Sequence, residues 1–363
     1  MTASAAVPAT AAGDIERVSG FTAQHRAMVA SAVDRAILPG VATFRAAAKN
    51  LQDRIDAWCA SGDTPAVPAD VTTAFREAAL GFAAIAHLRF GPLRDDNRLP
   101  RLAFWPDPRG VVRRQTLKAL AVADPNLTTR AGVAVQSAAL QGLPALEVLL
   151  TLSAKEDPGN AGAFRCRFAA AIAANVATLA AEVDEGWRGP DGWAARILSP
   201  GADNATYRSE MESAAEVLKA YLAGWQIVGE QEVTPWIDAA QKGKSWAGLP
   251  FERSGLSKTY VEAQVRALDE LSRALGLSVI ASRLGREDAN SAWIENWIAT
   301  ATASLRRDSS VLALPADLAA KPGTDIDPLR RVKFYANGLR QVVGRQIAVA
   351  ANVLIGFNDL DGD

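Results

Sequence analysis

Histidine and cysteine are scarce in this sequence, with only two of each among its 363 residues. The two histidines, His25 and His87, are too few for a three-histidine zinc site, and no HExxH sequence occurs. Cys59 and Cys166 lie in separate helical patterns and lack the CxxC spacing of metal and redox sites. We therefore predict that both cysteines are buried free thiols, in preference to a disulfide or metal ligands.

An excess of charge and a long apolar run are also missing. The 39 basic and 40 acidic residues give a net charge of −1, which argues against a nucleic acid as partner. The longest apolar candidate, AVAANVLIGF near the C-terminus, falls well short of the ~20 residues that span a bilayer. We therefore predict no transmembrane segment.

The first residues, MTASAAVPATAAGD, have neither the basic nor the apolar region of a signal peptide. Their alanine, proline and threonine content is typical of a segment that follows a cleavage site or a lipid anchor. We predict a disordered leader over residues 1–18.

Helical periodicity dominates the rest of the chain, and the high alanine content favours helices further. One helix face carries apolar residues at steps of three and four, namely Phe164, Phe168, Ile172, Val176, Leu179 and Val183. The predicted helices span 19–38, 41–61, 69–90, 110–122, 128–153, 160–185, 206–229, 233–242, 256–277, 287–306 and 327–355. Alternation typical of strands is rare, so the predicted fold is all-α.

A segment rich in proline and glycine divides the predicted helices into two groups. Its sequence, GWRGPDGWAARILSPGADNA, covers residues 186–205. We predict an N-terminal helical bundle over 19–200 and a C-terminal helical bundle over 201–363, each with about four main helices. The helix count suggests two duplicated four-helix bundles, although the residues show no evident self-similarity.

Polar and loop-forming residues gather between positions 87 and 110. His87 follows an apolar run, where a buried histidine with a backbone partner is as reasonable as a functional one. Asp107, between two prolines, can cap the helix expected to begin near Pro108, and Trp105 can anchor the loop. Asp107 and Arg109 could instead line a pocket. His25 is expected at a surface or capping position.

Two further segments carry candidate residues. In QGLPALE, Gly142 interrupts a helix and Pro144 favours the first turn of a new one, which places Glu147 near a helix N-terminus. In LPFERSGLS, Arg253 and Ser254 lie in a loop before a helix, where serine is a natural N-cap.

Taken in order, these segments resemble the imelysin family, specifically its predicted periplasmic lipoprotein branch. The likeness rests on HLRFGPL at 87–93, FWPDPRG at 104–110, QGLPALE at 141–147, LPFERSGLS at 249–257 and GFNDLDGD at 356–363. The resemblance implies two related helical bundles with a cleft between them. It also implies export to the periplasm or the outer membrane, often with a lipid anchor, and a link to iron acquisition.

The same resemblance implies a metallopeptidase, because members of the family carry a GxHxxE motif. Here the motif reads Gly142, Pro144 and Glu147, so proline replaces the histidine. A proline side chain cannot ligate a metal, and a single carboxylate does not make a zinc site. Direct iron binding at this motif is weakened for the same reason.

We predict a ligand-binding site in which polar residues from both bundles converge. Its members are Glu147, His87, Arg89, Asp107, Trp105, Arg253 and Ser254, with Glu147 and His87 as the candidate metal ligands. The expected function is a non-enzymatic component of iron acquisition that binds a small ligand, a metal chelate or an envelope protein partner. Iron is the cofactor that the resemblance implies. The alternatives are a metallopeptidase that uses His87, Glu147 and Asp107, and a structural protein of the envelope.

Overall fold

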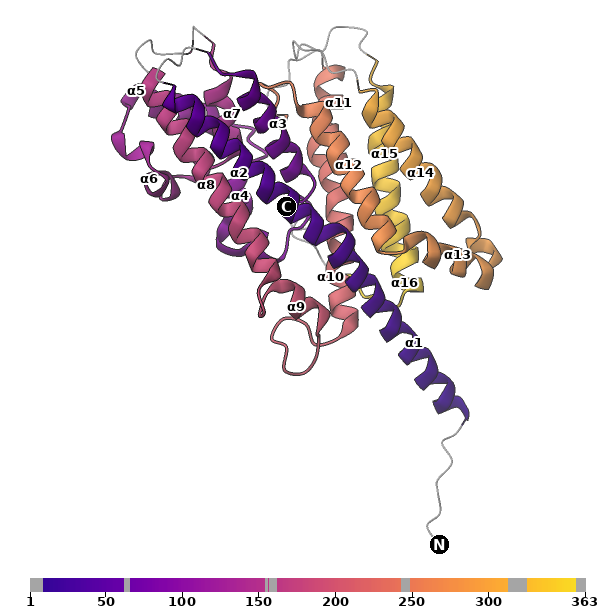
Figure 1. Ribbon diagram of the computed structural model, residues 1–363. Helices are drawn as coiled ribbons and strands as arrows, with labels where there is room; N and C mark the ends of the chain where they lie inside the picture. The colour runs from indigo at the N-terminus through magenta and orange to yellow at the C-terminus, as the bar shows by residue number, and fades with distance from the viewer. Residues whose placement is uncertain are drawn as a thin grey trace.

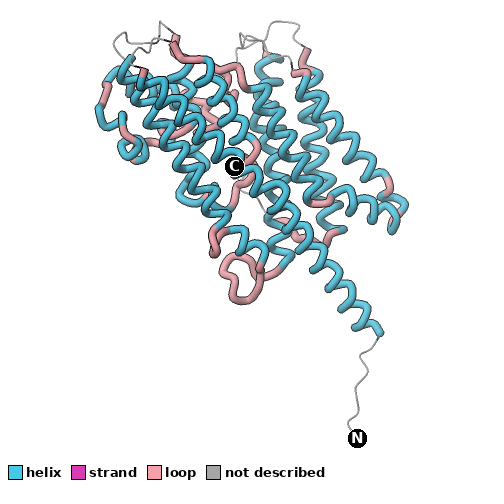
Figure 2. Tube along the Cα trace, in the orientation of Figure 1, coloured by secondary structure: helices cyan, strands magenta, loops and turns pink. Residues whose placement is uncertain are grey.

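The computed structural model describes residues 9–61, 66–153, 156, 162–242, 249–312 and 325–356. Within these residues every regular element is a helix, which confirms the predicted all-α fold (Figure 2). Residues 1–8 of the predicted leader and 357–363 of the acidic C-terminus lie outside the described part. The helix α1 begins at Ala9, within the segment for which we predicted a disordered leader.

Ten helices of eleven or more residues form most of the described structure (Figure 1). They are α1 (Ala9–Ala32), α2 (Leu38–Ala60), α3 (Ala69–Ala83), α5 (Val111–Val122), α8 (Gly162–Arg188), α10 (Glu210–Gln226), α12 (Ser257–Ala274), α13 (Leu277–Glu287), α14 (Trp293–Ser310) and α15 (Asp327–Val342). Shorter helices are α4 (Arg98–Leu102), α6 (Arg130–Ala134), α7 (Leu143–Leu150), α9 (Trp193–Leu198), α11 (Thr234–Gln241) and α16 (Ala348–Ala350). The helix α13 was not predicted from the sequence.

Helices that belong to the same half of the chain pack side by side. The helix α2 contacts α8 and α3, whereas α14 contacts α15 and α12. In Figure 1, α2 to α8 gather on the left and α10 to α16 on the right. The helix α3 contacts α12 and thus joins the two groups. The domain boundary after residue 200 stays a prediction.

The first helix also packs against the second half of the chain. The helix α1 runs diagonally across the molecule in Figure 1 and contacts α10 and α12. His25 on α1 is buried, and its Nε2 donates a hydrogen bond to the carbonyl of Ala351 at 2.7 Å. The expected surface position of His25 is therefore wrong, because its ring contacts Ala351, which lies 326 positions away in the sequence.

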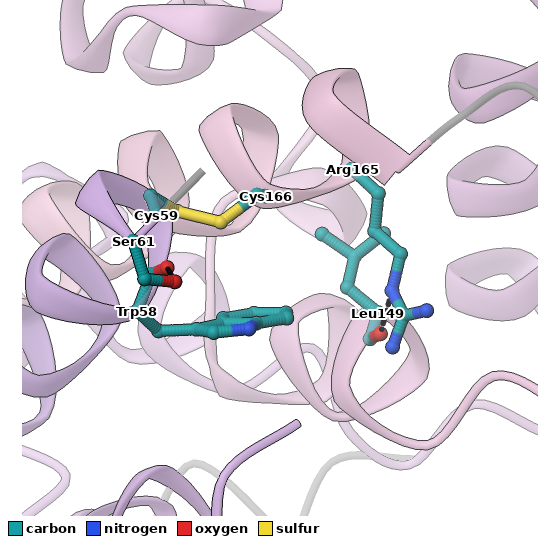
Figure 3. The surroundings of a disulfide bond; sticks show 6 residues. All are labelled: Trp58, Cys59, Ser61, Leu149, Arg165 and Cys166. Carbon is teal, nitrogen blue, oxygen red and sulfur yellow. Dashed lines mark hydrogen bonds between the residues drawn. A yellow bond between two sulfur atoms is a disulfide. The ribbon is translucent and has the colours of Figure 1, made fainter. Parts of the chain in front are cut away.

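The two cysteines form a disulfide, so the prediction of free thiols is wrong (Figure 3). Cys59 lies at the end of α2 and Cys166 near the start of α8, and the packing of these helices brings the two Cα atoms to 5.6 Å. That separation lies within the range that a disulfide requires. The sequence places the cysteines 107 residues apart and gives no sign that their helices are neighbours.

Two prolines lie just after π-helical turns. Pro39 follows the π-helix η1 (Val33–Ile37), and Pro235 follows the π-helix η6 (Ile227–Val233). A π-turn widens the helix and already leaves a backbone amide without its usual carbonyl acceptor. A proline at this point therefore destabilises the helix little. The helical rod therefore continues from α1 through η1 into α2, and the predicted break at residues 38–40 is wrong.

Two helical stretches, Ser19–Ala60 and Ala163–Leu198, are long and apolar enough to cross a membrane by length and composition alone. In the second stretch 67% of the apolar window is buried inside the protein, as in the core helix of a globular domain. The first stretch lies near the N-terminus and is 39% buried. That the chain lacks a transmembrane segment stays a prediction.

Candidate functional site

A cavity of about 480 Å³ opens between two parts of the chain that lie about 100 residues apart in the sequence. Aromatic and aliphatic side chains and prolines form most of its wall, and charged groups sit among them. The lining residues are Phe104, Trp105, Asp107, Pro108, Gly110, Val112, Arg113, Pro144, Glu147, Val148, Leu249, Pro250, Phe251, Glu252, Arg253 and Tyr260.

The helix α7 reaches this cavity because a glycine breaks the preceding helical run. A Cβ atom at Gly142 would lie 2.2 Å from the carbonyl oxygen of Leu102, so no other residue fits where the backbone of α4 passes. Pro144 then occupies the first turn of α7, where its missing N–H leaves no hydrogen bond unmade. The single helix predicted over 128–153 is therefore wrong, whereas the predicted interruption at Gly142 and the first-turn position of Pro144 are confirmed. The new helix places Glu147 in the cavity wall.

Glu147 is the most deeply buried carboxylate of the cavity. Its side chain comes from α7, and its Oε1 accepts hydrogen bonds from the backbone N–H of Ser254 at 2.9 Å and from the Ser254 hydroxyl at 2.6 Å. Burial raises the pKa of Glu147 to about 7, against the lowering effect of the Ser254 hydrogen bonds and the charge of Arg253. The carboxyl group therefore changes its charge close to neutral pH.

A tight loop before α12 holds Ser254 against Glu147. Phe251 adopts a left-handed conformation with φ of +54°, which is rare for a bulky residue. The N–H of Leu256 donates to the Phe251 carbonyl at 2.9 Å, and the Ser257 hydroxyl donates to the Pro250 carbonyl at 2.8 Å. Ser254 does not cap α12, as its position before the helix suggested, because Leu256 occupies the N-cap position.

Arg253 of the same loop joins a charged cluster beside the cavity. Its guanidinium donates to both Glu156 oxygens at 3.2 and 2.8 Å and to the hydroxyl of Thr151, at the end of α7, at 3.0 Å. Arg113 of α5 donates to Glu156 at 2.9 Å. The hydrogen bond from Arg253 is the main reason that the pKa of Glu156 lies far below its usual value. This cluster fixes the loop to the end of α7.

Asp107 serves the first turn of α5, as its place in the sequence predicted, although this helix begins at Val111 rather than near Pro108. Its two carboxylate oxygens accept from the backbone N–H groups of Val111 and Val112, each at 2.8 Å. Trp105 lies beside it in the cavity wall. Arg109, which we considered as a pocket residue, is exposed and does not line the cavity.

Replacing Asp107 with alanine should lower the free energy of unfolding by about 1 kcal/mol, because two backbone donors lose their acceptor. Asparagine keeps an acceptor oxygen, so Asp107→Asn should lose less than Asp107→Ala. Urea denaturation of the three proteins measures both differences. Equal stability of Asp107→Ala and the wild-type protein would show that these hydrogen bonds contribute nothing.

His87 and Arg89 do not line the cavity. His87 is buried and packs beside Gly224 of α10, where a Cβ atom on the glycine would lie 3.0 Å from its own Cβ. Burial lowers the pKa of His87 to about 4, so its side chain is neutral at neutral pH. The charge of Arg89 acts on Glu232 and Tyr260, and Tyr260 reaches the cavity wall. The sequence suggested a single cluster, but the structure separates these two residues from the cavity.

Two functional candidates, Glu156 and Glu232, were missed from the sequence. Glu156 lies in a loop with no motif around it, and its role depends on the two arginines that contact it. Glu232 is buried, but it lies in the segment WQIVGEQEV among three other polar side chains, so the sequence does not single it out. Its Oε1 accepts from Gln264 at 3.0 Å, and burial raises its pKa to about 8.

The donor set around Glu147 does not fit a metal ion. Pro144 stands at the histidine position of the GxHxxE motif, and both oxygens of Asp107 accept backbone hydrogen bonds. Among the described residues, no three histidine, cysteine, aspartate or glutamate side chains are placed to hold a metal ion together. His87 and Glu147, the candidate ligands from the sequence, do not share a wall of this cavity.

Comparison with known proteins agrees with the resemblance seen in the sequence. The model of a peptidase family described as imelysin matches residues 37–279, more than half of the chain. An imelysin-like protein from Psychrobacter arcticum has a similar structure, with a TM-score of 0.71 and 15% identity, over 93% of this chain and 98% of that one.

A second solved structure is equally similar in fold. It is that of a candidate iron-regulated protein A precursor from Parabacteroides distasonis, with a TM-score of 0.71 and 13% identity, over 91% of this chain and 95% of that one. No curated protein sequence matches the chain. At these identities the two structures establish a shared fold.

Proposed function

Because this chain belongs to the imelysin family, we propose that it is a binding protein of the bacterial envelope that captures a small organic ligand in the Glu147 cavity. The observation that carries the proposal is the buried carboxyl group of Glu147 in a wall that is otherwise mostly apolar. Ligand sites combine such apolar walls with a few placed polar groups.

The chemistry of the wall selects the ligand class. Glu147 uses Oε1 for Ser254, and no described residue donates to its Oε2. A ligand with an amine or hydroxyl group can donate to this oxygen, while its apolar body contacts Phe104, Trp105 and Phe251. Arg113 and Arg253 are already paired with Glu156, so they are less suited to hold a ligand anion.

Two observations support an oxidising compartment outside the cytoplasm. The disulfide between Cys59 and Cys166 is typical of exported proteins. The Parabacteroides protein of the same fold is described as a precursor and as iron-regulated. For this chain we propose that a link to iron runs through an organic chelate, because the donor set at Glu147 does not suit a bare ion.

The proposal is tested with three probes that share a naphthalene ring, namely naphthylmethylamine, naphthalenemethanol and naphthoate. Calorimetric titration should give the tightest binding for the amine and the weakest for the carboxylate, since the anion would face Glu147. Amine binding should strengthen about tenfold between about pH 6 and about pH 8, as Glu147 ionises. Glu147→Gln should abolish both the preference for the amine over the carboxylate and the pH dependence of amine binding.

Glu295→Gln, an exposed change on α14, is the matched control and should bind all three probes as the wild-type protein does. Absence of binding for every probe, or the same order of affinities in Glu147→Gln, would overturn the proposed ligand class. The family name also indicates a peptidase. Zinc-dependent cleavage of peptides that disappears in Glu147→Ala would favour that activity over binding.

A further inference from the structure

A second cavity, of about 450 Å³, lies in the C-terminal half of the chain and shares no lining residue with the Glu147 cavity. Its polar wall comes from α10, η6, α15 and the π-helix η8 (Val343–Ile347). Three basic side chains reach it from three of these elements, namely Lys219 from α10, Arg340 from α15 and Arg345 from η8.

The single carboxylate among the lining residues is already engaged. Glu230 accepts from the side-chain amide of Asn337 at 2.7 Å and lies 3.7 Å from the ammonium group of Lys333. Lys333 therefore balances the charge of Glu230, and this carboxylate leaves the positive charge of the other side chains largely uncompensated.

The second cavity keeps an excess of positive charge. Lys219 pairs with Glu216 at 3.0 Å, whereas Arg340 donates to the neutral side chain of Gln226 at 3.1 Å. Among the described residues, no carboxylate contacts the Arg340 or Arg345 guanidinium. Both groups remain charged at any physiological pH and present several N–H donors.

Two of the lining residues lie in π-helical turns. Glu230 belongs to η6 and Arg345 to η8. A π-turn sacrifices regular helical hydrogen bonding and occurs frequently at functional sites. Here two such turns border the same cavity, and this supports a functional site independently of the charges.

We propose that this second cavity binds a small organic anion with two or more carboxylate groups. Arginine side chains form paired hydrogen bonds with carboxylates, and the two guanidinium groups, which no described carboxylate contacts, match an anion with more than one negative charge. Leu222 and Ile355 add apolar contact area that favours a carbon skeleton over a bare inorganic anion. This site is separate from the ligand site at Glu147 and does not depend on it.

Calorimetric titration with citrate, inorganic phosphate and acetate tests the proposal. Citrate should bind with a stoichiometry of about one, phosphate should bind more weakly, and acetate should give no saturable signal. Arg345→Ala should weaken citrate binding at least about tenfold. Arg345→Lys, which keeps the charge, should lose less, and added salt should weaken binding to the wild-type protein.

Arg266→Ala removes an exposed arginine of α12 outside the cavity and is the matched control. It should bind citrate as the wild-type protein does, and so should Glu147→Gln. Arg345 is exposed, so its replacement is expected to leave the unfolding temperature unchanged, which a thermal denaturation scan checks. Phosphate binding tighter than citrate, no saturable signal from citrate, or unchanged citrate affinity in Arg345→Ala would overturn the proposal.

Discussion

Reduction of the Cys59–Cys166 disulfide should lower the free energy of unfolding by about 2–5 kcal/mol. The bond joins residues that are 107 positions apart, and a loop of this length has a large entropy in the unfolded chain when the bond is absent. Because the disulfide restricts mainly the unfolded state, its loss should destabilise the fold even if the helices remain in place. Urea denaturation with and without dithiothreitol measures the effect.

The double variant Cys59→Ala/Cys166→Ala supplies the control for this experiment. It should be about as unstable as the reduced wild-type protein, and dithiothreitol should not change its stability further. A thiol assay on the unfolded, non-reduced wild-type protein should find no reactive sulfhydryl. Two reactive thiols in the protein isolated from an oxidising compartment would contradict the disulfide itself.

The disulfide also supports the helix that carries Glu147. The side chain of Arg165, next to Cys166, donates from Nε to the carbonyl of Leu149 on α7 at 2.8 Å, and its guanidinium lies 6.0 Å from the ring of Trp58 (Figure 3). Trp58 precedes Cys59 on α2. The residues beside the covalent bond thus contact one another, and Arg165 contacts the helix that carries Glu147.

Helical periodicity was enough to predict the fold class, because apolar residues at steps of three and four identify a buried helix face without any tertiary information. Periodicity failed where tertiary packing decides the course of the backbone. The glycine and proline of QGLPALE indicated the break at Gly142, but not the carbonyl of Leu102 that requires a glycine there. The helix continues through Pro39 because of a π-turn, which no local sequence pattern shows.

The candidate site was only partly predictable for the same reason. The family resemblance grouped Glu147 with Arg253 and Ser254, and the structure places these three residues together. It also grouped His87 and Arg89 with them, but neither residue lines the cavity, and His87 packs beside Gly224. A motif lists residues and does not fix the direction in which each side chain points.

The pH dependence of stability should identify Glu147 as a buried group that holds a proton near neutral pH. Its pKa is about 7 in the folded protein against a usual value of 4.5. Between these values the folded state keeps a proton that the unfolded state has lost, so the free energy of unfolding falls as the pH rises. The full contribution is present below pH 4.5 and is lost by about pH 7, a change of about 3 kcal/mol for this group.

Glu147→Gln separates this effect from those of the other titrating groups. Glutamine has a similar shape and does not titrate, and it can still accept the hydrogen bonds from Ser254. His87 and Glu232 are present in both proteins, so their contributions cancel in the difference between the two. The wild-type protein should therefore lose stability relative to Glu147→Gln as the pH rises from about 5 to about 8. Parallel denaturation curves over this range would show that Glu147 is already ionised in the fold, and its carboxylate would then carry a charge at every pH where the cavity meets a ligand.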